Sequence, residues 1–232
     1  MSGNSSAGAY PPAGAPYRFF EVCVDGRDWR LRGVLDQAAL LEASGRFKSV
    51  PYGLLLWPSA VALAELLASE ADLLAGARVL ELGCGLGLPG LTALAAGASV
   101  TLSDHEPAAI ELALENAALN GLPRPNVLVA DWADWPTGAS YDLVVAADVL
   151  YERAAGPALL DVVGRTVALG GAFIAADPER PQALEWFARA ERAGWEAEIV
   201  GFRSASVPDE PTPRRISLLK LERRSTSCDA AG

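Results

Sequence analysis

Residues 79–90 read VLELGCGLGLPG, an apolar run typical of a buried strand that then breaks into glycines. From Gly85 the stretch matches G-x-G-x-x-G, in which glycines allow a tight turn and the close approach of a dinucleotide to the backbone. Pro89 suits the first turn of a following helix, where a missing N–H costs nothing. The stretch therefore predicts a strand, a ligand-binding loop and a helix in succession.

The chain after this point alternates between strand-like and helical patterns. Strand-like runs occupy residues 77–82, 98–104, 126–130, 141–148 and 171–177, and helical patterns occupy residues 88–96, 107–120, 153–168 and about 181–193. Short strands that alternate with helices predict a parallel sheet of βαβ units. Two later runs, WEAEIVGF and RRISLLKLE, have only a loop between them, which favours an antiparallel pair at the sheet edge.

The N-terminal part has a different pattern. Two strand-like runs from residue 18 flank Asp25-Gly26, a dipeptide typical of a two-residue β-hairpin. A short polar linker follows, and Ser59 is expected to cap a helix that runs to about Leu74. We expect one domain over residues 18–224, with the hairpin and linker at 18–50 and the core at 51–224, between a disordered tail at 1–17 and a frayed tail at 225–232.

The composition argues against several classes of protein. With 232 residues, 51% of them hydrophobic, the chain can bury the core of one domain. A net charge of −10 argues against a nucleic-acid partner, which needs clustered Lys and Arg. Neither a signal peptide nor an apolar run of membrane-spanning length is recognisable, so we expect a cytoplasmic protein with no membrane partner. One His and three scattered Cys predict neither a metal site nor a disulfide framework, and many arginines beside only Lys48 and Lys220 hint at a bacterial genome.

Acidic residues follow the second and third expected strands. Asp104 can accept both hydroxyls of a ribose, or it can cap the following helix. Asp131 can accept an adenine amine and Trp132 can stack on the ring, although tryptophan also commonly packs in a core. His105 is expected to be a loop residue. These residues are compatible with a dinucleotide and with an adenosine-containing methyl donor.

Read from Glu81, the glycine stretch has the form acid-x-G-x-G-x-G, which resembles motif I of the class I S-adenosylmethionine-dependent methyltransferases. The chain further resembles methyltransferase family 16, the seven-β-strand protein-lysine methyltransferases. The shared features are LLLWPSA with Trp57, ELGCGLG, Asp131-Trp132, and the D-x-x-Y of Asp148 and Tyr151. WPSA, the motif I string and DPER (177–180) are most similar to the branch that methylates the electron-transfer flavoprotein β-subunit. The chain departs from the family in having Ala-Asp-Trp, repeated at 133–135, where Leu-Asp-Trp is common.

This resemblance implies an α/β fold with a Rossmann-like, doubly wound sheet of seven strands, mostly parallel with an antiparallel C-terminal strand. It implies S-adenosylmethionine as the methyl donor, with the carboxylate of Glu81 reaching the donor's amino group. As catalytic residues, Asp148 would orient the acceptor amine and Tyr151 would form a wall of its channel. The residues expected to contact the donor are Trp57, Glu81, Gly83, Cys84, Gly85, Gly87, Asp104, Asp131, Trp132 and Ala147.

Several functions stay open at this point. The first is methylation of a lysine in a protein substrate, and the second is methylation of a small, nicotinamide-type amine, a label that bacterial relatives with these motifs often carry. An NAD-dependent oxidoreductase is a third, but the sequence offers it no evident hydride-site acid or base. A protein that binds the donor without turnover is the last. Trp57 is compatible with packing over the donor or with anchoring a helix, and Asp148 and Tyr151 are compatible with a helix-start acid and a packed aromatic residue.

Overall fold

The computed structural model describes residues 16–43, 50–136, 138–208 and 210–223. The expected disorder of residues 1–15 and the expected fraying of residues 225–232 lie outside these ranges. Tyr17, which was expected to belong to the tail, is instead the first residue of a strand.

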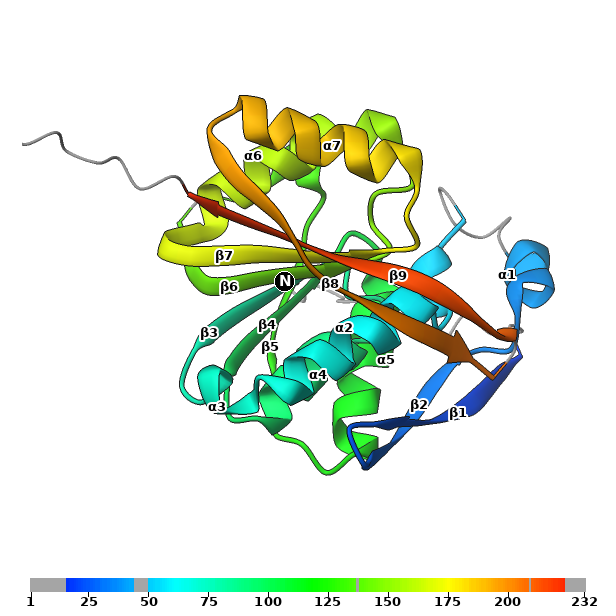
Figure 1. Ribbon diagram of the computed structural model, residues 1–232. Helices are drawn as coiled ribbons and strands as arrows, with labels where there is room; N and C mark the ends of the chain where they lie inside the picture. The colour runs from blue at the N-terminus through cyan, green and yellow to red at the C-terminus, as the bar shows by residue number, and fades with distance from the viewer. Residues whose placement is uncertain (1–15, 44–49, 137, 209, 224–232) are drawn as a thin grey trace, which may run out of the picture.

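A seven-stranded sheet forms the centre of the molecule, in the order β5-β4-β3-β6-β7-β9-β8 (Figure 1). Its strands are β3 (Arg78–Leu82), β4 (Ser99–Asp104), β5 (Asn126–Val129), β6 (Tyr141–Ala147), β7 (Val167–Asp177), β8 (Trp195–Val207) and β9 (Glu210–Arg223). The five strands from β5 to β7 are parallel, and β9 runs antiparallel to both β7 and β8. The predicted mostly parallel, doubly wound sheet with an antiparallel C-terminal strand is therefore confirmed.

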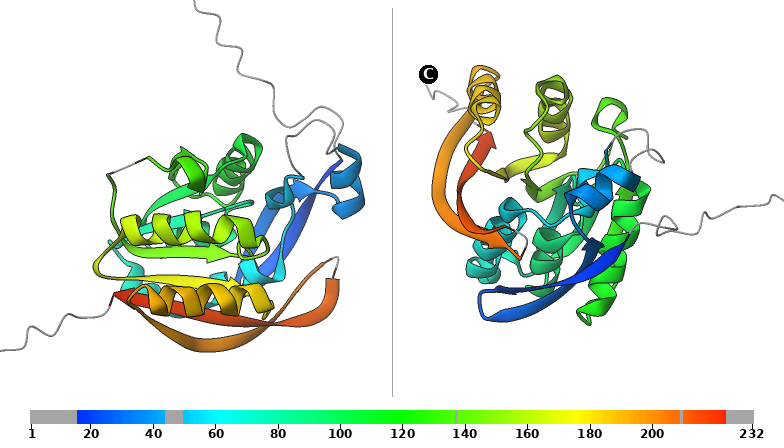
Figure 2. Two further views of the ribbon diagram at one scale, coloured as in Figure 1. Left: turned by 90° about the horizontal axis from the view of Figure 1, so that it is seen from above. Right: turned by 90° about the vertical axis from the view of Figure 1, so that its right-hand side faces the viewer.

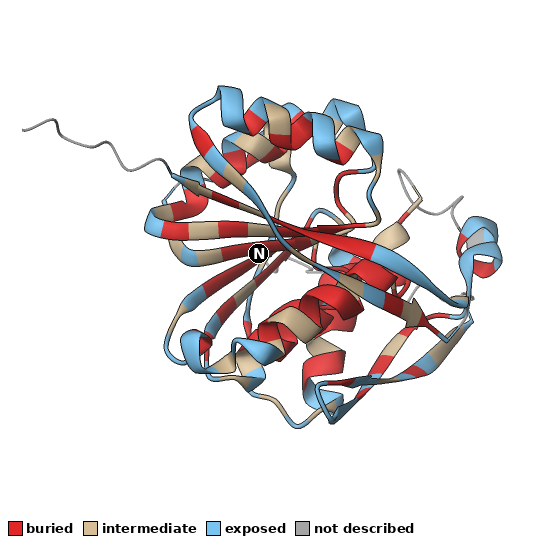
Figure 3. Ribbon diagram, viewed as in Figure 1, coloured by how far each residue is buried: buried red, intermediate tan, exposed pale blue. Residues whose placement is uncertain are grey.

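Helices cover both faces of this sheet (Figures 1 and 2). One face carries α2 (Pro58–Ser69), α4 (Leu88–Ala95) and α5 (Pro107–Leu119), and the other carries α6 (Gly156–Thr166) and α7 (Pro181–Arg192). Successive side chains of β3 alternate between the two cores, with Val79 in the first and Leu80 in the second. Buried residues accordingly concentrate on the strands and on the inward sides of the helices (Figure 3).

The predicted N-terminal hairpin is present and is attached to α5. Strands β1 (Tyr17–Val24) and β2 (Arg27–Val34) pair antiparallel across Asp25-Gly26, both at positive φ, as the two-residue turn requires. The backbone N–H of Arg32 donates to Asn116 Oδ1 at 2.7 Å, and that of Arg30 donates to Asn120 Oδ1 at 3.0 Å. These bonds attach β2 to α5, and the buried side chains of the hairpin belong to the same hydrophobic core as those of α5.

Several expected boundaries were wrong. The helix expected from Ser59 to Leu74 consists of α2 and a separate short α3 (Ala71–Leu74), and Trp57 rather than Ser59 is its N-cap residue. Pro58 takes the first helical position, for which its fixed φ is suited. The polar linker contains a short helix, α1 (Gln37–Ala43), and β7 begins at Val167, within the segment expected to be helical. Within the described ranges, no helix is long and apolar enough to span a membrane.

Candidate functional site

The strand order reverses at β3, which lies between β4 and β6. At such a point of an open α/β sheet, a crevice forms beyond the carboxyl ends of the strands. A cavity of about 410 Å³ lies at this place. Its lining includes all the residues proposed from the sequence for donor and acceptor, namely Trp57, Glu81, Gly83, Cys84, Gly85, Gly87, Asp104, Asp131, Trp132, Ala147, Asp148 and Tyr151.

The glycine loop has two positions at which a side chain would collide with its surroundings. Gly85 has a φ of +51°, and a Cβ there would lie 2.7 Å from the carbonyl oxygen of Gly53. A Cβ on Gly90 would lie 2.4 Å from Leu102 Cδ2 and 2.6 Å from Glu81 Oε2. The first glycine lets the loop turn against the segment before α2, and the second lets α4 pack directly on the sheet.

Glu81 lies beneath this loop, at the end of β3. Its side chain is 1% exposed, and its Oε2 accepts a hydrogen bond from the Gly90 N–H at 2.9 Å. Burial raises the pKa of Glu81 to about 8, although the hydrogen bond from Gly90 opposes this rise. Glu81 therefore fastens the first turn of α4 to the sheet as well as lining the cavity, a contact that the sequence pattern did not predict.

Both carboxylate oxygens of Asp104 are held by backbone N–H groups. Oδ2 accepts from the Gly85 N–H and Oδ1 accepts from the Glu106 N–H, each at 3.0 Å. Burial raises the pKa of Asp104, and these two hydrogen bonds oppose the rise. The alternative role of Asp104 as a helix cap is wrong, because α5 is capped by Glu106, whose carboxylate accepts from the Ala108 N–H. His105 is an exposed loop residue, as expected.

The two Asp-Trp pairs lie in different surroundings. Trp132 lines the cavity beside Gly83, with its Cζ2 atom 3.6 Å from the place where a Cβ on that glycine would be. Asp131 caps the short 3-10 helix that begins at Trp132. Trp135 is buried in the core on the α6 side of the sheet. The first Asp-Trp pair, and not its repeat, thus belongs to the cavity.

Asp148 is held by two residues that the sequence did not assign to this site. It follows β6 with a φ of +60°, and its side chain is 10% exposed. Ser59 Oγ donates to its Oδ2 at 2.9 Å, and Arg180 forms an ion pair with its Oδ1. Arg180 is also paired with Asp177, at 3.0 Å. The sequence predicts Ser59 as a helix cap and places Asp177 and Arg180 only in the DPER motif. It does not connect these three residues with Asp148, because they are distant from it in the sequence.

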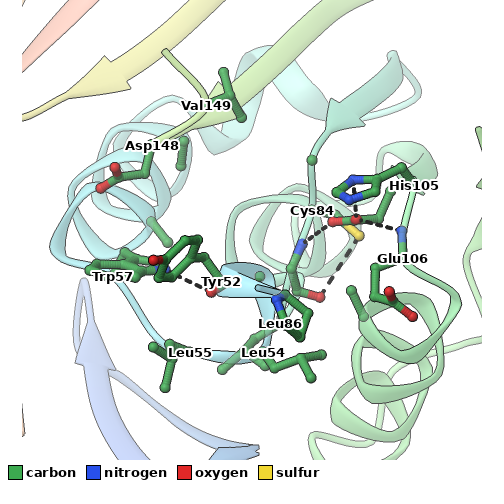
Figure 4. A pocket seen from close by; sticks show the side chains of 18 of the residues that line it. Tyr52, Leu54, Leu55, Trp57, Cys84, Leu86, His105, Glu106, Asp148 and Val149 are labelled. Atoms are coloured by element: carbon green, nitrogen blue, oxygen red, sulfur yellow. Dashed lines mark hydrogen bonds and ion pairs between the residues drawn. The ribbon is translucent and has the colours of Figure 1, made fainter. Parts of the chain in front are cut away.

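Three aromatic rings lie near Asp148 along the same part of the cavity. The ring centroid of Tyr52 is 6.3 Å from that of Trp57 and 6.2 Å from that of Tyr151, each in an edge-to-face arrangement. Trp57 Nε1 donates to the backbone oxygen of Tyr52 at 2.9 Å (Figure 4). Trp57 therefore anchors the start of α2 and also lines the cavity. Burial, together with the nearby carboxylate of Glu152, raises the pKa of Tyr151, so that its phenol stays neutral.

The lining is strongly acidic. In the described part of the chain it contains neither Lys nor Arg, whereas its acids are Glu81, Asp104, Glu106, Asp131, Asp148 and Glu152. An anionic ligand would find no countercharge there, whereas a cationic ligand would be attracted. The cavity is therefore suited to a positively charged ligand rather than to a pyrophosphate.

The strand order, the insertion of β9 between β7 and β8, and the glycine loop at the switch point define a Rossmann-like protein of the methyltransferase class. The T. thermophilus 16S rRNA N2 G1207 methyltransferase RsmC, solved with AdoMet and guanosine, has the same fold. Its TM-score is 0.63 at 18% identity, over 92% of this chain and 52% of that chain. The chain belongs to the lysine methyltransferase family, whose model matches residues 39–192.

Two curated relatives show the range of this family. Histone-arginine methyltransferase METTL23 of Rattus norvegicus is 35% identical over 109 residues, which cover 44% of this chain and 48% of the relative. Electron transfer flavoprotein beta subunit lysine methyltransferase of Xenopus laevis is 31% identical over 134 residues, which cover 57% of this chain and 54% of the relative. The chain spans about half the length of these relatives. Because their names specify different acceptor side chains, the acceptor must be argued from the site.

Proposed function

We propose that this protein is an S-adenosylmethionine-dependent N-methyltransferase that transfers a methyl group to the side-chain amine of a lysine in a protein substrate. Membership of the lysine methyltransferase family and relatives named for lysine and arginine methylation support this proposal. The observation that carries it is the acidic cavity beside the glycine loop, in which Asp148 and three aromatic rings lie together.

S-adenosylmethionine fits this cavity better than a dinucleotide does. S-adenosylmethionine carries a sulfonium cation, and the lining supplies carboxylates that attract one. A dinucleotide carries a pyrophosphate, which commonly binds to the free N–H groups of a helix N-terminus. In α4 the N–H of Gly90 already donates to the carboxylate of Glu81. The carboxyl group of Glu81 thus occupies one of the positions that a pyrophosphate would need.

The donor would be held by residues that converge from the ends of β3, β4 and β5. Asp104, whose two oxygens are oriented by backbone N–H groups, would accept the ribose hydroxyls, and Asp131 and Trp132 would hold the adenine. Glu81 would face the donor's amino group. When bound, S-adenosylmethionine supplies a methyl group on a sulfonium that an amine can displace. The other proposed contacts are Trp57, Gly83, Cys84, Gly85, Gly87 and Ala147.

The acceptor would enter between Asp148 and the aromatic rings of Tyr52 and Tyr151. Transfer requires a neutral amine about 3 Å from the methyl carbon and in line with the C–S bond. A lysine amine has a pKa near 10.4, so its neutral form at pH 7 lies about 4.6 kcal/mol above the ammonium form. Asp148 would accept a hydrogen bond from the amine and orient it, while the ring faces of the tyrosines favour a cationic side chain on its way in. The proton would leave to water or through the carboxylate.

The proposal also includes a cytoplasmic location, a bacterial source and the absence of nucleic-acid and membrane partners. The absence of a nucleic-acid partner rests on the net charge of −10, and the bacterial source rests on two lysines beside many arginines. The cytoplasmic location rests on three scattered cysteines without a disulfide pattern, and the absence of a membrane partner rests on the lack of a long apolar run.

The test is to incubate the purified protein with methyl-tritiated S-adenosylmethionine and a cell extract, and to separate macromolecules from small solutes. Label in a discrete protein band, recovered as methyl-lysine after acid hydrolysis, supports the proposal. Label confined to the small-solute fraction would instead indicate a small, nicotinamide-type amine as acceptor. Binding of the donor without any transfer would indicate a donor-binding protein.

Variants separate donor binding from transfer in the same assay. Asp148→Ala should bind the donor and fail to transfer the methyl group, and full activity of this variant would contradict the assignment of Asp148. Self-methylation has an unusually simple control, because the sequence contains only Lys48 and Lys220. The double variant Lys48→Arg/Lys220→Arg has no lysine to label and should still methylate the extract protein.

A further inference from the structure

One guanidinium links two carboxylates at the edge of the cavity. The Nη1 atom of Arg180 lies 3.0 Å from Asp177 Oδ2, and its Nη2 atom is paired with Asp148 Oδ1. Asp177, whose side chain is 1% exposed, also accepts the backbone N–H of Arg180 at 2.7 Å. Arginine can bridge two acids in this way because its planar group carries donors on both arms, whereas lysine presents a single point charge.

The local backbone is shaped around this bridge. Asp148 follows β6 and Glu179 precedes Arg180, and both have a φ of +60°, which is unfavourable for residues other than glycine. Such conformations cost about 1–3 kcal/mol each and persist only where surrounding contacts hold them. In this structure the contacts that meet at Arg180 are those from Asp177 and Asp148.

Arg180 and Ser59 contact Asp148 from outside the cavity. Asp148 lines the cavity, and neither Arg180 nor Ser59 does. Each carboxylate oxygen has two lone pairs, so one protein contact on each oxygen leaves acceptor capacity for a ligand. The two contacts therefore fix the direction of the carboxylate without blocking it.

We propose that Arg180 is a positioning residue for methyl transfer, which fixes the Asp148 carboxylate and offsets its charge so that the acceptor amine loses its proton more readily. The proposal rests on the methylation of an amine inferred above. A carboxylate without a countercharge would stabilise the ammonium form of the acceptor, and an ammonium group cannot accept a methyl group. The guanidinium of Arg180 contacts Asp148 on the side away from the acceptor, and its positive charge disfavours the ammonium form of the amine. The carboxylate of Asp148 still accepts the hydrogen bond that orients the amine.

The other charged groups around Asp148 do not supply this offset. Burial and the neighbouring carboxylates raise the pKa of Tyr151, so it contributes no charge near neutral pH, and the carboxylates of Glu152 and Asp104 are negative. Asp177 is negative and already paired. Arg180 is thus the cation beside Asp148 in the described ranges of the chain.

Three variants distinguish charge from geometry. Initial rates of tritium transfer into the extract protein are measured from pH 6 to pH 10. Arg180→Gln removes the charge, so the rate at pH 7 should fall at least tenfold. The acidic limb of the pH–rate profile should shift to higher pH. For a unit charge ~7 Å from the amine at an effective dielectric constant of about 20, this shift to higher pH is roughly one to two pH units.

The matched controls keep the charge. Arg180→Lys retains the positive charge but loses the bridge, so its rate should fall at every pH while the acidic limb stays at the wild-type position. Ser59→Ala removes a neutral hydrogen bond from the same carboxylate and should behave likewise. A limb that moves equally in all three variants would overturn the proposal.

Folding is monitored by circular dichroism and donor binding by calorimetry, because Arg180→Gln leaves the buried Asp177 without its ion pair. The double variant Asp177→Asn/Arg180→Gln replaces the ion pair by a neutral pair. It should also shift the acidic limb to higher pH, but by less than Arg180→Gln, because the loss of the more distant Asp177 charge acts in the opposite direction. If wild-type protein transfers methyl groups but neither variant moves the limb, Arg180 is merely structural and this proposal fails alone. If the wild-type protein transfers no methyl group to an amine, both the proposed function and this proposal are wrong.

Discussion

Glu81 should make the stability of the protein fall as pH rises. Burial raises its pKa from the ordinary value of 4.5 to about 8 in the folded protein. Between these values the folded protein keeps a proton that the unfolded chain releases, so the stabilisation is complete below pH 4.5 and is lost as pH rises through 8. At about 1.36 kcal/mol per pH unit, the whole effect amounts to roughly 4–5 kcal/mol. Glu81→Gln removes it, because glutamine keeps an acceptor for the Gly90 N–H and cannot ionise.

The assay is urea unfolding of the wild type and of Glu81→Gln at pH 5 and pH 9. At pH 5 the folded wild type carries a protonated Glu81 that resembles glutamine, so the two free energies of unfolding should agree within about 1 kcal/mol. At pH 9 the variant should be more stable by roughly 4 kcal/mol. The raised pKa of Asp177 acts in both proteins and cancels in the comparison. A difference that is the same at both pH values would refute the assignment of a buried, protonated Glu81.

Three further substitutions test other parts of the structure. Asp104→Ala should abolish binding of S-adenosylmethionine in isothermal titration calorimetry, and an unchanged affinity would remove this residue from the donor site. Gly85→Ala places a methyl group 2.7 Å from a carbonyl oxygen at a φ of +51°, so the free energy of unfolding should fall by about 2–4 kcal/mol, whereas a thermal midpoint equal to the wild type would contradict the geometry. Asn116→Ala breaks hydrogen bonds to the backbone of the hairpin and of the glycine loop, so urea unfolding should show a loss of about 2–3 kcal/mol, and a loss under ~0.5 kcal/mol would argue against this link.

The parallel strands and the hairpin could be predicted because their signals are local. A run such as residues 143–147 is apolar on both faces, and Asp25-Gly26 specifies its own turn. The start of α2 was predicted wrongly because Ser59 is a good cap in general, while the preceding Pro58 is better suited to the first helical position. The start of β7 was missed because Val167–Gly170 continues the apolar pattern of the preceding helix.

The cavity could be predicted in outline because its residues follow strand ends, and the topology of a parallel sheet brings those ends together. The repeat of Ala-Asp-Trp carried no sign of which tryptophan faces the cavity. The fold separates them, because Trp135 is buried in the core while Trp132 is only partly buried and lines the cavity. Ser59 and Arg180 reach Asp148 across 89 and 32 residues. A contact of that kind depends on the packing of α2 and α7 against the ends of β6 and β7, and no local pattern encodes it.

The position of β9 sets the order in which the molecule can be completed during synthesis. β9 follows β8 in the sequence, yet it lies between β7 and β8 and forms hydrogen bonds with both of them. On the ribosome β8 emerges before β9, its neighbour in the sheet among the described residues, and β7 presents an open edge in the same interval. β9 then inserts between β7 and β8 and pairs with both. A nascent chain that stalls before residue 210 therefore exposes the open edge of β7 and the unpaired β8 at once.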